Sequence, residues 1–578
     1  MNIAESVIWT ALHLGILALM LLASGGIGHL FLRRFNFHST IERLVFTVSL
    51  GLGTCALIIF ILGLFGLLYK VVVWILTAIG AASTTLYLAR AHKGEPLRKP
   101  RFRKERLASH VKPSTLIVIA AFAYWVVLLL STQYPPLHWD AISHHLVLSR
   151  EYVEQHRVVV VMGIHFPILP SLNHMLFSWA LALKDDVLAQ MVEHAFLMLT
   201  AGGLYSWGSR QKRPAFGIAM AAFWLGSPLV LWLGEAAYVD VCLATFVFLG
   251  VFALRLFWES RQAGWWYLSA ALLGMAAGVK LPGLFFLIIA GALGFLAFLR
   301  WKGAFSWRPL IQGWGVGAIV VLPWYLFIFY HTGNPFWPTF PEYSSGVWGS
   351  PEVVRGVNAW LTGAGQSRHL RNFFTLSIDW INHPERFQAE NNLSLFPLII
   401  AWPVTWIIAL WNQHVRWWAL WALAFTLFWY QHPQLLRYWL PALPLAIIAL
   451  CESIRWVVES AWKSVAFHRV VWATIACLAV AWGGNSIGRE LRYKGLPPTD
   501  QQQREAFVSM LGGYSAVKHL NQQADKNDTV CVINASYLNY YLKPRKLDMF
   551  GLLYSPRLPK FRWPDDAEWI RWLESQNA

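Results

Sequence analysis

The sequence predicts an all-α polytopic membrane protein, with about fourteen transmembrane helices and a small C-terminal α/β domain. Of its 578 residues, 57% are hydrophobic and 13% are charged, whereas soluble domains have about 45–50% and about 25%. The apolar residues recur in runs of roughly 20, the length that spans a bilayer. The 34 Trp residues suit the two interfacial belts of a membrane protein. This apolar excess therefore faces lipid.

The expected spans follow from the apolar runs, with boundaries good to a few residues. They are 7–32, 44–68, 71–89, 113–132, 187–207, 214–233, 241–258, 265–280, 283–300, 309–330, 393–411, 416–432, 438–455 and 470–487. The apolar stretch 168–183 is short and contains Asn173 and His174, so we expect an interfacial or re-entrant helix there.

The net charge of +17 does not indicate a nucleic-acid-binding protein, because the basic residues lie between apolar runs. The segment from Arg90 to Lys112 carries nine of the 47 basic residues. The positive-inside rule places this segment in the cytoplasm and both termini outside, in the plasma (inner) membrane. Four of the five cysteines fall within apolar runs, so no disulfide framework is expected.

The chain divides into three predicted parts. They are an N-terminal three-helix extension with a basic cytoplasmic loop (1–112), a transmembrane core (113–487) with outer loops 133–186 and 331–392, and a soluble extracytoplasmic domain (488–578). In this last part, a polar helical stretch (501–523) precedes the β-like runs 529–533 and 537–541. This alternation is typical of a small α/β domain.

Polar residues at the ends of several spans converge on the outer face. Ionisable groups within or beside a membrane are costly and indicate function by default. The polar residues that converge here are Asp140 and His144 in the first outer loop, Glu235 and Asp240 between the sixth and seventh spans, Lys280 between the eighth and ninth, and Arg437 with Tyr438 between the twelfth and thirteenth.

Each of these residues also has a plainer interpretation. Lys280 could extend to the interface, and Arg437 could form a structural salt bridge with Glu235 or Asp240. His145 is more simply an interfacial histidine. His165 and His174 are expected to be solvated loop residues.

Several of these segments resemble the GT-C membrane glycosyltransferases, which include the protein O-mannosyltransferases and the lipid A aminoarabinose transferase. The resemblance covers residues 113–487 and leaves out the first three spans and the tail. It rests on Trp139-Asp140-Ala141 with His144 and Phe166-Pro167, on Ala237-Tyr238-Val239-Asp240, on Gly278-Val279-Lys280, on Pro323-Trp324-Tyr325 followed by Thr332-Gly333-Asn334-Pro335, and on Arg437-Tyr438 with Pro441 and Pro444.

The resemblance implies an inverting glycosyltransferase that moves a sugar from a polyprenyl-phosphate donor to a glycan, lipid or protein acceptor on the outer face. A base must activate the acceptor hydroxyl, and Asp140 suits this role, with His144 orienting it or sharing it. Cations stabilise the lipid phosphate that leaves, which suits Lys280 and Arg437.

The remaining predicted roles concern the acceptor and a metal. Glu235, Asp240 and Tyr438 are candidates for binding the acceptor or the sugar. The family pattern often has two acids close together in the first loop, whereas this chain has one acid followed by histidines. No cofactor is therefore assigned, and a divalent cation, held by Asp140 and His144, is left open.

Two other functions compete with a transferase. A lipid-linked polysaccharide ligase or polymerase would have an Arg-rich outer loop, and residues 331–392 contain four Arg. A transporter of a lipid-linked or small solute would carry charged or broken helices at mid-membrane and a repeat between its halves. The polar residues of this chain cluster at one face instead.

Overall fold

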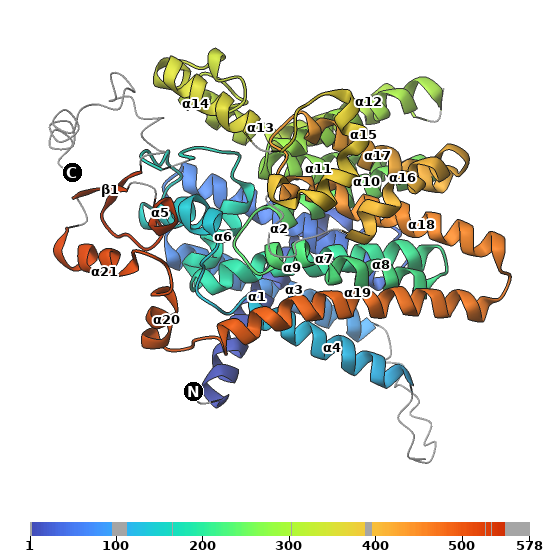
Figure 1. Cartoon of the computed structure of the whole chain (residues 1–578), viewed down its shortest axis with the longest axis horizontal. Coiled ribbons are helices and arrows are strands. Elements are labelled where there is room, and N and C mark those ends of the chain that lie inside the picture. The colour runs from blue at the N-terminus through green and yellow to red at the C-terminus, as the bar shows by residue number, and fades with distance from the viewer. Residues whose placement is uncertain are drawn as a thin grey trace.

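The computed structural model of the chain is a bundle of long helices with a small tail at one end (Figure 1). The structure describes residues 3–94, 113–164, 166–301, 303, 305–363, 365–387, 396–525, 528–532 and 535–548. The membrane helices are α1 (Ile3–Leu32), α2 (Thr40–Leu64), α3 (Lys70–Gly94), α4 (Pro113–Ser131), α7 (Asp186–Arg210), α8 (Pro214–Gly226), α9 (Pro228–Gly234), α10 (Asp240–Ser260), α11 (Ala263–Val279), α12 (Pro282–Arg300), α13 (Trp307–Thr332), α16 (Phe396–Trp411), α17 (Gln413–Tyr430), α18 (Leu443–Ala461) and α19 (Val465–Lys494).

A helix, or in one case a bent pair, lies at each of the predicted spans. Within the described residues, nine helices are long and apolar enough to cross a membrane, or ten if the pair α8–α9 is one span. The 67° bend of that pair lies at Ser227-Pro228, where proline supplies no N–H to continue the helix. The protein is therefore polytopic and almost entirely helical, and within the described residues fewer helices meet this length and composition than the fourteen spans expected. One of the shorter ones is α11, with 17 residues.

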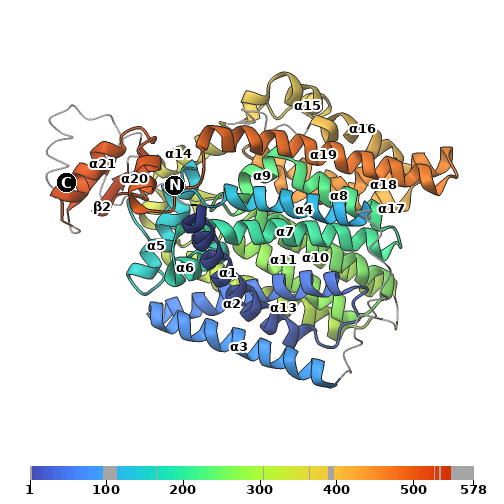
Figure 2. The same cartoon turned by 90° about the horizontal axis from the view of Figure 1, so that it is seen from below.

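Helices α7 and α10 form the centre of the bundle. About 89% of the apolar window of each is buried, whereas the corresponding share for α19 is 11%. Figure 2 shows α19, α4 and α7 running side by side along the length of the molecule. Arg210 at the far end of α7 pairs with Glu42 near the start of α2, at 2.8 Å. This pair marks the end of the bundle opposite the tail.

The segment predicted to be an interfacial or re-entrant helix is a short helix that is buried within the protein. Helix α6 (Leu172–Leu183) packs against α2, α5 (Leu146–Glu154) and α7, and almost all of its side chains are buried. Asn173 explains why a polar residue is tolerated here, because its amide bonds to Glu193 of α7 and to the Tyr238 carbonyl. Both of these bonds use the amide nitrogen of Asn173, and they reduce the cost of burying its side chain.

Two amphipathic helices follow α13, which ends at Gly333 in a left-handed conformation (φ 73°). They are α14 (Pro351–Thr362) and α15 (Leu370–Asn382). Figure 1 shows them on the side of α12 and α13. They belong to the second predicted outer loop, part of which lies outside the described residues.

The tail differs from its predicted secondary structure. The expected polar helix is two helices, α20 (Gln501–Val508) and α21 (Tyr514–Gln523), separated at Gly513, whose φ of 82° favours glycine. The strand β1 (Thr529–Val532) lies within the predicted run 529–533 and pairs in parallel with β2 (Arg545–Asp548). Residues 537–541, expected to be β-like, lie in a 3-10 helix (Ser536–Leu538) and the turn that follows it.

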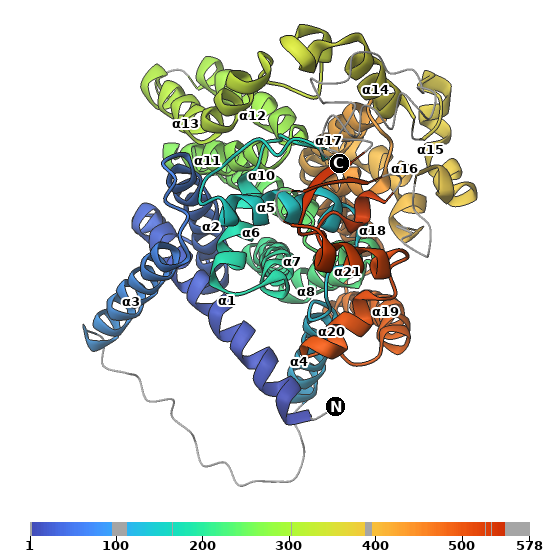
Figure 3. The ribbon, with the colours of Figure 1, turned by 90° about the vertical axis from the view of Figure 1, so that its left-hand side faces the viewer.

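The tail also packs directly on the first outer loop, at the end of the bundle that faces the viewer in Figure 3. The backbone N–H of Tyr540 donates to the Ile142 carbonyl at 2.9 Å, and that of Asp548 donates to the Gly163 carbonyl at 2.8 Å. Arg150 donates to the carbonyls of Tyr540 and Leu542. The domain boundary at residue 488 stays a prediction.

Candidate active site

The first outer loop forms a π-helical turn, η1 (Ala141–His145), between α4 and α5, and Asp140 immediately precedes it. A π-helix is wider than an α-helix and often lies at functional sites. This turn brings Asp140 and His144 together, with one potential ligand atom of each within 4.8 Å of the other. The backbone N–H of Asp140 donates to the Tyr238 hydroxyl at 3.4 Å.

Asp140 is buried and forms an ion pair with Arg437. Its Oδ2 lies 2.5 Å from Nη1 of Arg437, a residue of the 3-10 turn η5 (Leu436–Ala442) that precedes α18. The guanidinium lies 5.2 Å from the ring centre of Tyr238 and 5.0 Å from that of Tyr438, within the range of cation–π attraction. Arg437 is thus held by a salt bridge, as one interpretation of the sequence allowed, but its partner is Asp140 rather than Glu235 or Asp240.

The electrostatic setting of Asp140 keeps its carboxylate ionised. Burial raises the pKa of this carboxyl, but the charges of Arg437 and His144, with the hydrogen bond from Arg437, hold the pKa below its usual value. A carboxylate that stays charged at neutral pH can accept a proton from a hydroxyl.

A second ion pair lies beside the first. Asp240 begins α10, and its Oδ1 lies 3.0 Å from Nζ of Lys280. Lys280 sits in extended conformation at the break between α11 and α12, and its Nζ is 4.0 Å from the ring centre of Tyr438. Lys280 is therefore paired within the site rather than simply extended to the interface. Tyr438 contacts both cations.

Three histidines lie near Asp140. The Nδ1 of His144 lies 2.9 Å from the Ser143 hydroxyl, and that of His145 lies 2.8 Å from Nε2 of His174. His145 and His174 are buried, so the interfacial and solvated interpretations of these two are wrong. His165 lies outside the described residues. Burial, reinforced by the charge of His144, lowers the pKa of His145 well below its usual value, so this ring is neutral at pH 7.

Asp140, His144 and His145 are the described residues that could hold a metal ion. One potential ligand atom from each lies within 4.8 Å of the others. Carboxylate and imidazole are ligands that many divalent ions accept. Arg437 already bonds to Oδ2 of Asp140, so an ion would share this carboxylate with a guanidinium.

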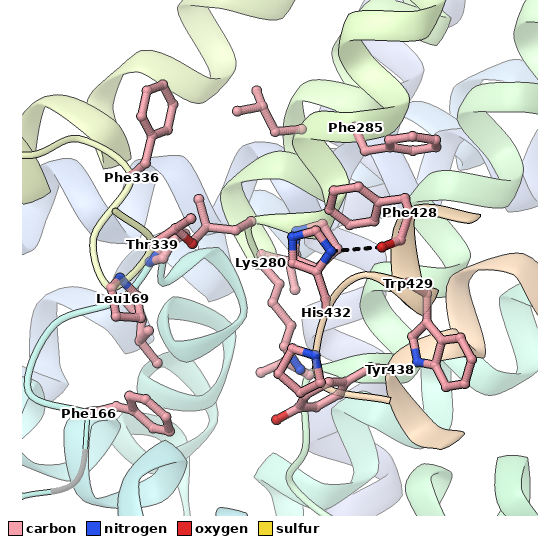
Figure 4. A pocket seen from close by; sticks show the side chains of 18 of the residues that line it. Phe166, Leu169, Lys280, Phe285, Phe336, Thr339, Phe428, Trp429, His432 and Tyr438 are labelled. Atoms are coloured by element: carbon pink, nitrogen blue, oxygen red, sulfur yellow. Dashed lines mark hydrogen bonds between the residues drawn. The ribbon is translucent and has the colours of Figure 1, made fainter. Parts of the chain in front are cut away.

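A cavity of about 550 Å³ joins these residues to the apolar side of the bundle. Asp140, His144, Lys280 and Tyr438 line one part of it, and Figure 4 shows Lys280 and Tyr438 at its base. Its remaining walls come from the second outer loop, α12 and α17, and include Phe336, Thr339, Phe285, Ile288, Phe425, Phe428 and His432. Ile288 is 63% exposed, so this part of the cavity borders the surface that faces lipid.

The structure brings most of the predicted site residues together, but not Glu235. Glu235 is buried at the end of α9, where its Oε1 lies 3.3 Å from Nζ of Lys494 and 3.3 Å from Nε2 of His138. It does not line the cavity. Lys494, at the end of α19, was not selected from the sequence because nothing in its local sequence marks it.

Other residues of the site were also missed. Tyr238 lies in the segment Ala237-Tyr238-Val239-Asp240, but no role was predicted for it from the sequence. His432 lines the cavity and donates from Nδ1 to the Phe428 carbonyl at 2.7 Å (Figure 4). A histidine at a hairpin between two spans was the available signal for it.

Comparisons with known proteins begin with a relative from Shigella flexneri, an uncharacterized protein. The chain is 34% identical to it over 141 residues, which make up 24% of this chain and 70% of that protein. The chain belongs to the family of this Shigella protein. No family model matches the chain.

Two solved structures are similar to the chain, both of ArnT from Cupriavidus metallidurans. One is a crystal structure bound to undecaprenyl phosphate, with 15% identity, 77% of this chain and 89% of that chain covered, and a TM-score of 0.48. The other is the apo state, with 15% identity, 80% and 92% covered, and a TM-score of 0.45.

Proposed function

We propose that this chain is a glycosyltransferase that moves a sugar from a polyprenyl-phosphate donor to an acceptor hydroxyl, with Asp140 as general base. The proposal rests on one observation, a single cavity whose wall is polar in one part and apolar in the rest. One part holds a carboxylate and a cation, and the rest is lined by aromatic and aliphatic side chains beside the lipid-facing surface. A lipid-linked sugar phosphate needs both environments at once.

The chemistry follows from the paired charges. The sugar–oxygen bond to the phosphate breaks, the acceptor oxygen bonds to the sugar carbon, and the acceptor proton passes to Asp140. The phosphate that leaves gains negative charge, which Lys280 and Arg437 stabilise. Arg437 can bind two phosphate oxygens at once, whereas Lys280 acts as a point charge.

The salt bridge between Arg437 and Asp140, which exists before a donor binds, gives Arg437 a further role. Because Arg437 bonds to Asp140, a donor phosphate competes with this carboxylate for the guanidinium. Binding of the donor then loosens the salt bridge and frees Asp140 to accept a proton. Asp240 and Tyr438 are left to bind sugar hydroxyls, and Glu235 is better suited to holding α9 against α19.

The test uses the full chain in detergent with a labelled polyprenyl-phosphate sugar. We expect transfer or hydrolysis that releases polyprenyl phosphate, and weaker binding of undecaprenyl phosphate in Lys280→Ala. Lys463→Ala, an exposed lysine between α18 and α19, is the matched control. Turnover of a diphosphate-linked polysaccharide alone would indicate a ligase or polymerase, and solute movement that needs sealed vesicles would indicate a transporter.

A further inference from the structure

A second cavity lies away from the active site, between the N-terminal three helices and the core. Its volume is about 1040 Å³, nearly twice that of the active-site cavity. Its walls come from α1, α2, α3, α4 and α7, and they are almost entirely apolar. Figure 3 shows α1, α2 and α3 on one side of the bundle, and α2 packs directly on α6 and α7.

The cavity opens to the lipid-facing surface along its length. Leu30 and Leu44 are among its lining residues, and they are 66% and 54% exposed. Exposed leucines in membrane helices face hydrocarbon chains. A groove that is apolar, wide and open to the bilayer is suited to hold chains of a lipid rather than a water-soluble ligand.

One end of this groove is basic. Arg43 and His29 line it there, and Arg33 and Arg34 follow α1 directly in the sequence. Of the described residues, Arg43 has no carboxylate within ion-pair distance, whereas its neighbour Glu42 is neutralised by Arg210. The excess positive charge therefore has no counterpart within the described part of the protein.

The basic end lies far from the active site. Glu42 pairs with Arg210 at one end of α7, whereas Asp186 at the other end bonds to Arg504 of the tail. A helix of 25 residues separates these ends by about 37 Å at about 1.5 Å per residue. A phosphate at Arg43 therefore cannot reach Lys280 or Arg437, and this groove is distinct from a donor site.

We propose that this groove binds one anionic diacyl phospholipid of the bilayer. Its phosphate is held by Arg43 beside His29, and its chains lie along α1 against α2 and α7. Charge complementarity selects an anionic headgroup. The volume of the groove, about 1040 Å³, favours two chains over the single chain of a polyprenyl carrier. The lipid would then join the N-terminal three helices to the core.

The experiment uses the delipidated full chain in detergent and compares phosphatidylglycerol with phosphatidylcholine of the same chains. Native mass spectrometry gives the bound lipid, and thermal unfolding gives the shift in Tm. We expect one phosphatidylglycerol per chain and a higher Tm, with phosphatidylcholine binding more weakly. Arg43→Ala should weaken phosphatidylglycerol binding about ten-fold through loss of a charged hydrogen bond, and Arg43→Lys should restore part of it.

Two matched controls and a second variant keep the result decisive. Arg300→Ala removes an exposed arginine at the end of α12, outside the groove, and should leave lipid binding unchanged. Ala18→Phe fills the groove and should prevent binding, whereas Ala11→Phe, on the same helix but outside the groove, should not. Equal binding of the two phospholipids, unchanged binding in Arg43→Ala or Ala18→Phe, or Arg43-dependent binding of undecaprenyl phosphate but not of phosphatidylglycerol would overturn the proposal.

Discussion

The carboxylate of Asp140, which lines the active-site cavity, lies 2.5 Å from the guanidinium of Arg437. One follows the fourth helix and the other precedes the eighteenth, so the pair joins two distant parts of the chain. In the proposed reaction one residue is the base and the other binds the phosphate. Each restrains the other until a substrate separates them.

Asp140→Asn should reduce turnover by about 10²–10⁴, the usual cost of removing a positioned base. Asparagine keeps the shape of the side chain and has no charge that competes for Arg437, so undecaprenyl phosphate should bind at least as tightly as to the wild-type protein. Steady-state turnover and native mass spectrometry measure the two effects. His144→Ala should be milder if it only orients Asp140, and equally severe if both hold a metal. Near-normal transfer by Asp140→Asn would remove its catalytic role and direct attention to Asp240.

Arg437→Ala should weaken donor use by about 10–100-fold, because a charged hydrogen bond contributes about 1.5–3 kcal/mol. Arg437→Lys should recover only part of this, since lysine lacks the fork that fits phosphate. Arg455→Ala is a matched control, because Arg455 also forms a buried ion pair, with Glu452. A lower Tm with unchanged donor KM is expected for this control. A donor KM in Arg437→Ala equal to that of the wild-type protein would mean that Arg437 has only a structural role.

The pH dependence should reveal the coupling between these two residues. Because the pKa of Asp140 is lowered, its carboxylate stays ionised down to below about 3.9, the ordinary aspartate value. We therefore expect the kcat/KM of the wild-type protein to fall only below that pH. In Arg437→Ala, burial acts without the guanidinium, so the pKa rises and the limb moves to higher pH. A limb at the same pH in both proteins would disprove the coupling.

Weakening the contact between tail and loop should slow turnover without affecting donor binding. Arg150→Ala removes the donors to the carbonyls of Tyr540 and Leu542, which releases the tail from α5. Hydrogen exchange at residues 141–145 should become faster, and kcat should fall several-fold. Lys518→Ala breaks only an exposed pair within the tail and serves as the control. Unchanged exchange in Arg150→Ala would mean that the loop is ordered without the tail.

Reporter fusions test the predicted orientation. A reporter after Arg106 should read as cytoplasmic, and one after residue 495 should read as outside, because basic loops stay in the cytoplasm. The tail lies at the same end of the bundle as Asp140. A cytoplasmic tail would therefore place the cavity on the cytoplasmic side and contradict the proposed reaction.

The sequence predicted the helical membrane fold because apolar runs of bilayer length have few other solutions. It also located the residues of the two ion pairs, since charges beside a membrane are rare enough to be noticed individually. It did not predict which charges pair. For Arg437 the sequence suggested Glu235 or Asp240 as a salt-bridge partner, whereas the fold places its guanidinium against Asp140.

The errors have common physical causes. Helix α6 was expected at the interface because Asn173 and His174 are polar, but their hydrogen bonds with Glu193 and His145 allow burial. The run at 537–541 has the aromatic composition of a strand, yet tertiary contacts with the loop impose a turn. The residues that α6 and the run 537–541 contact lie on other elements, so the local sequence pattern does not reveal them.

The contact between Arg150 and Tyr540 joins residues 390 positions apart, and this separation has a consequence for biosynthesis. During synthesis the loop with Asp140 leaves the ribosome early, whereas the segment that covers it is made after all of the membrane helices. The outer wall of the site is therefore complete only when the last part of the chain has been translated and delivered to the same face. We therefore expect a chain that has not yet received its tail to have a less ordered loop at residues 141–145.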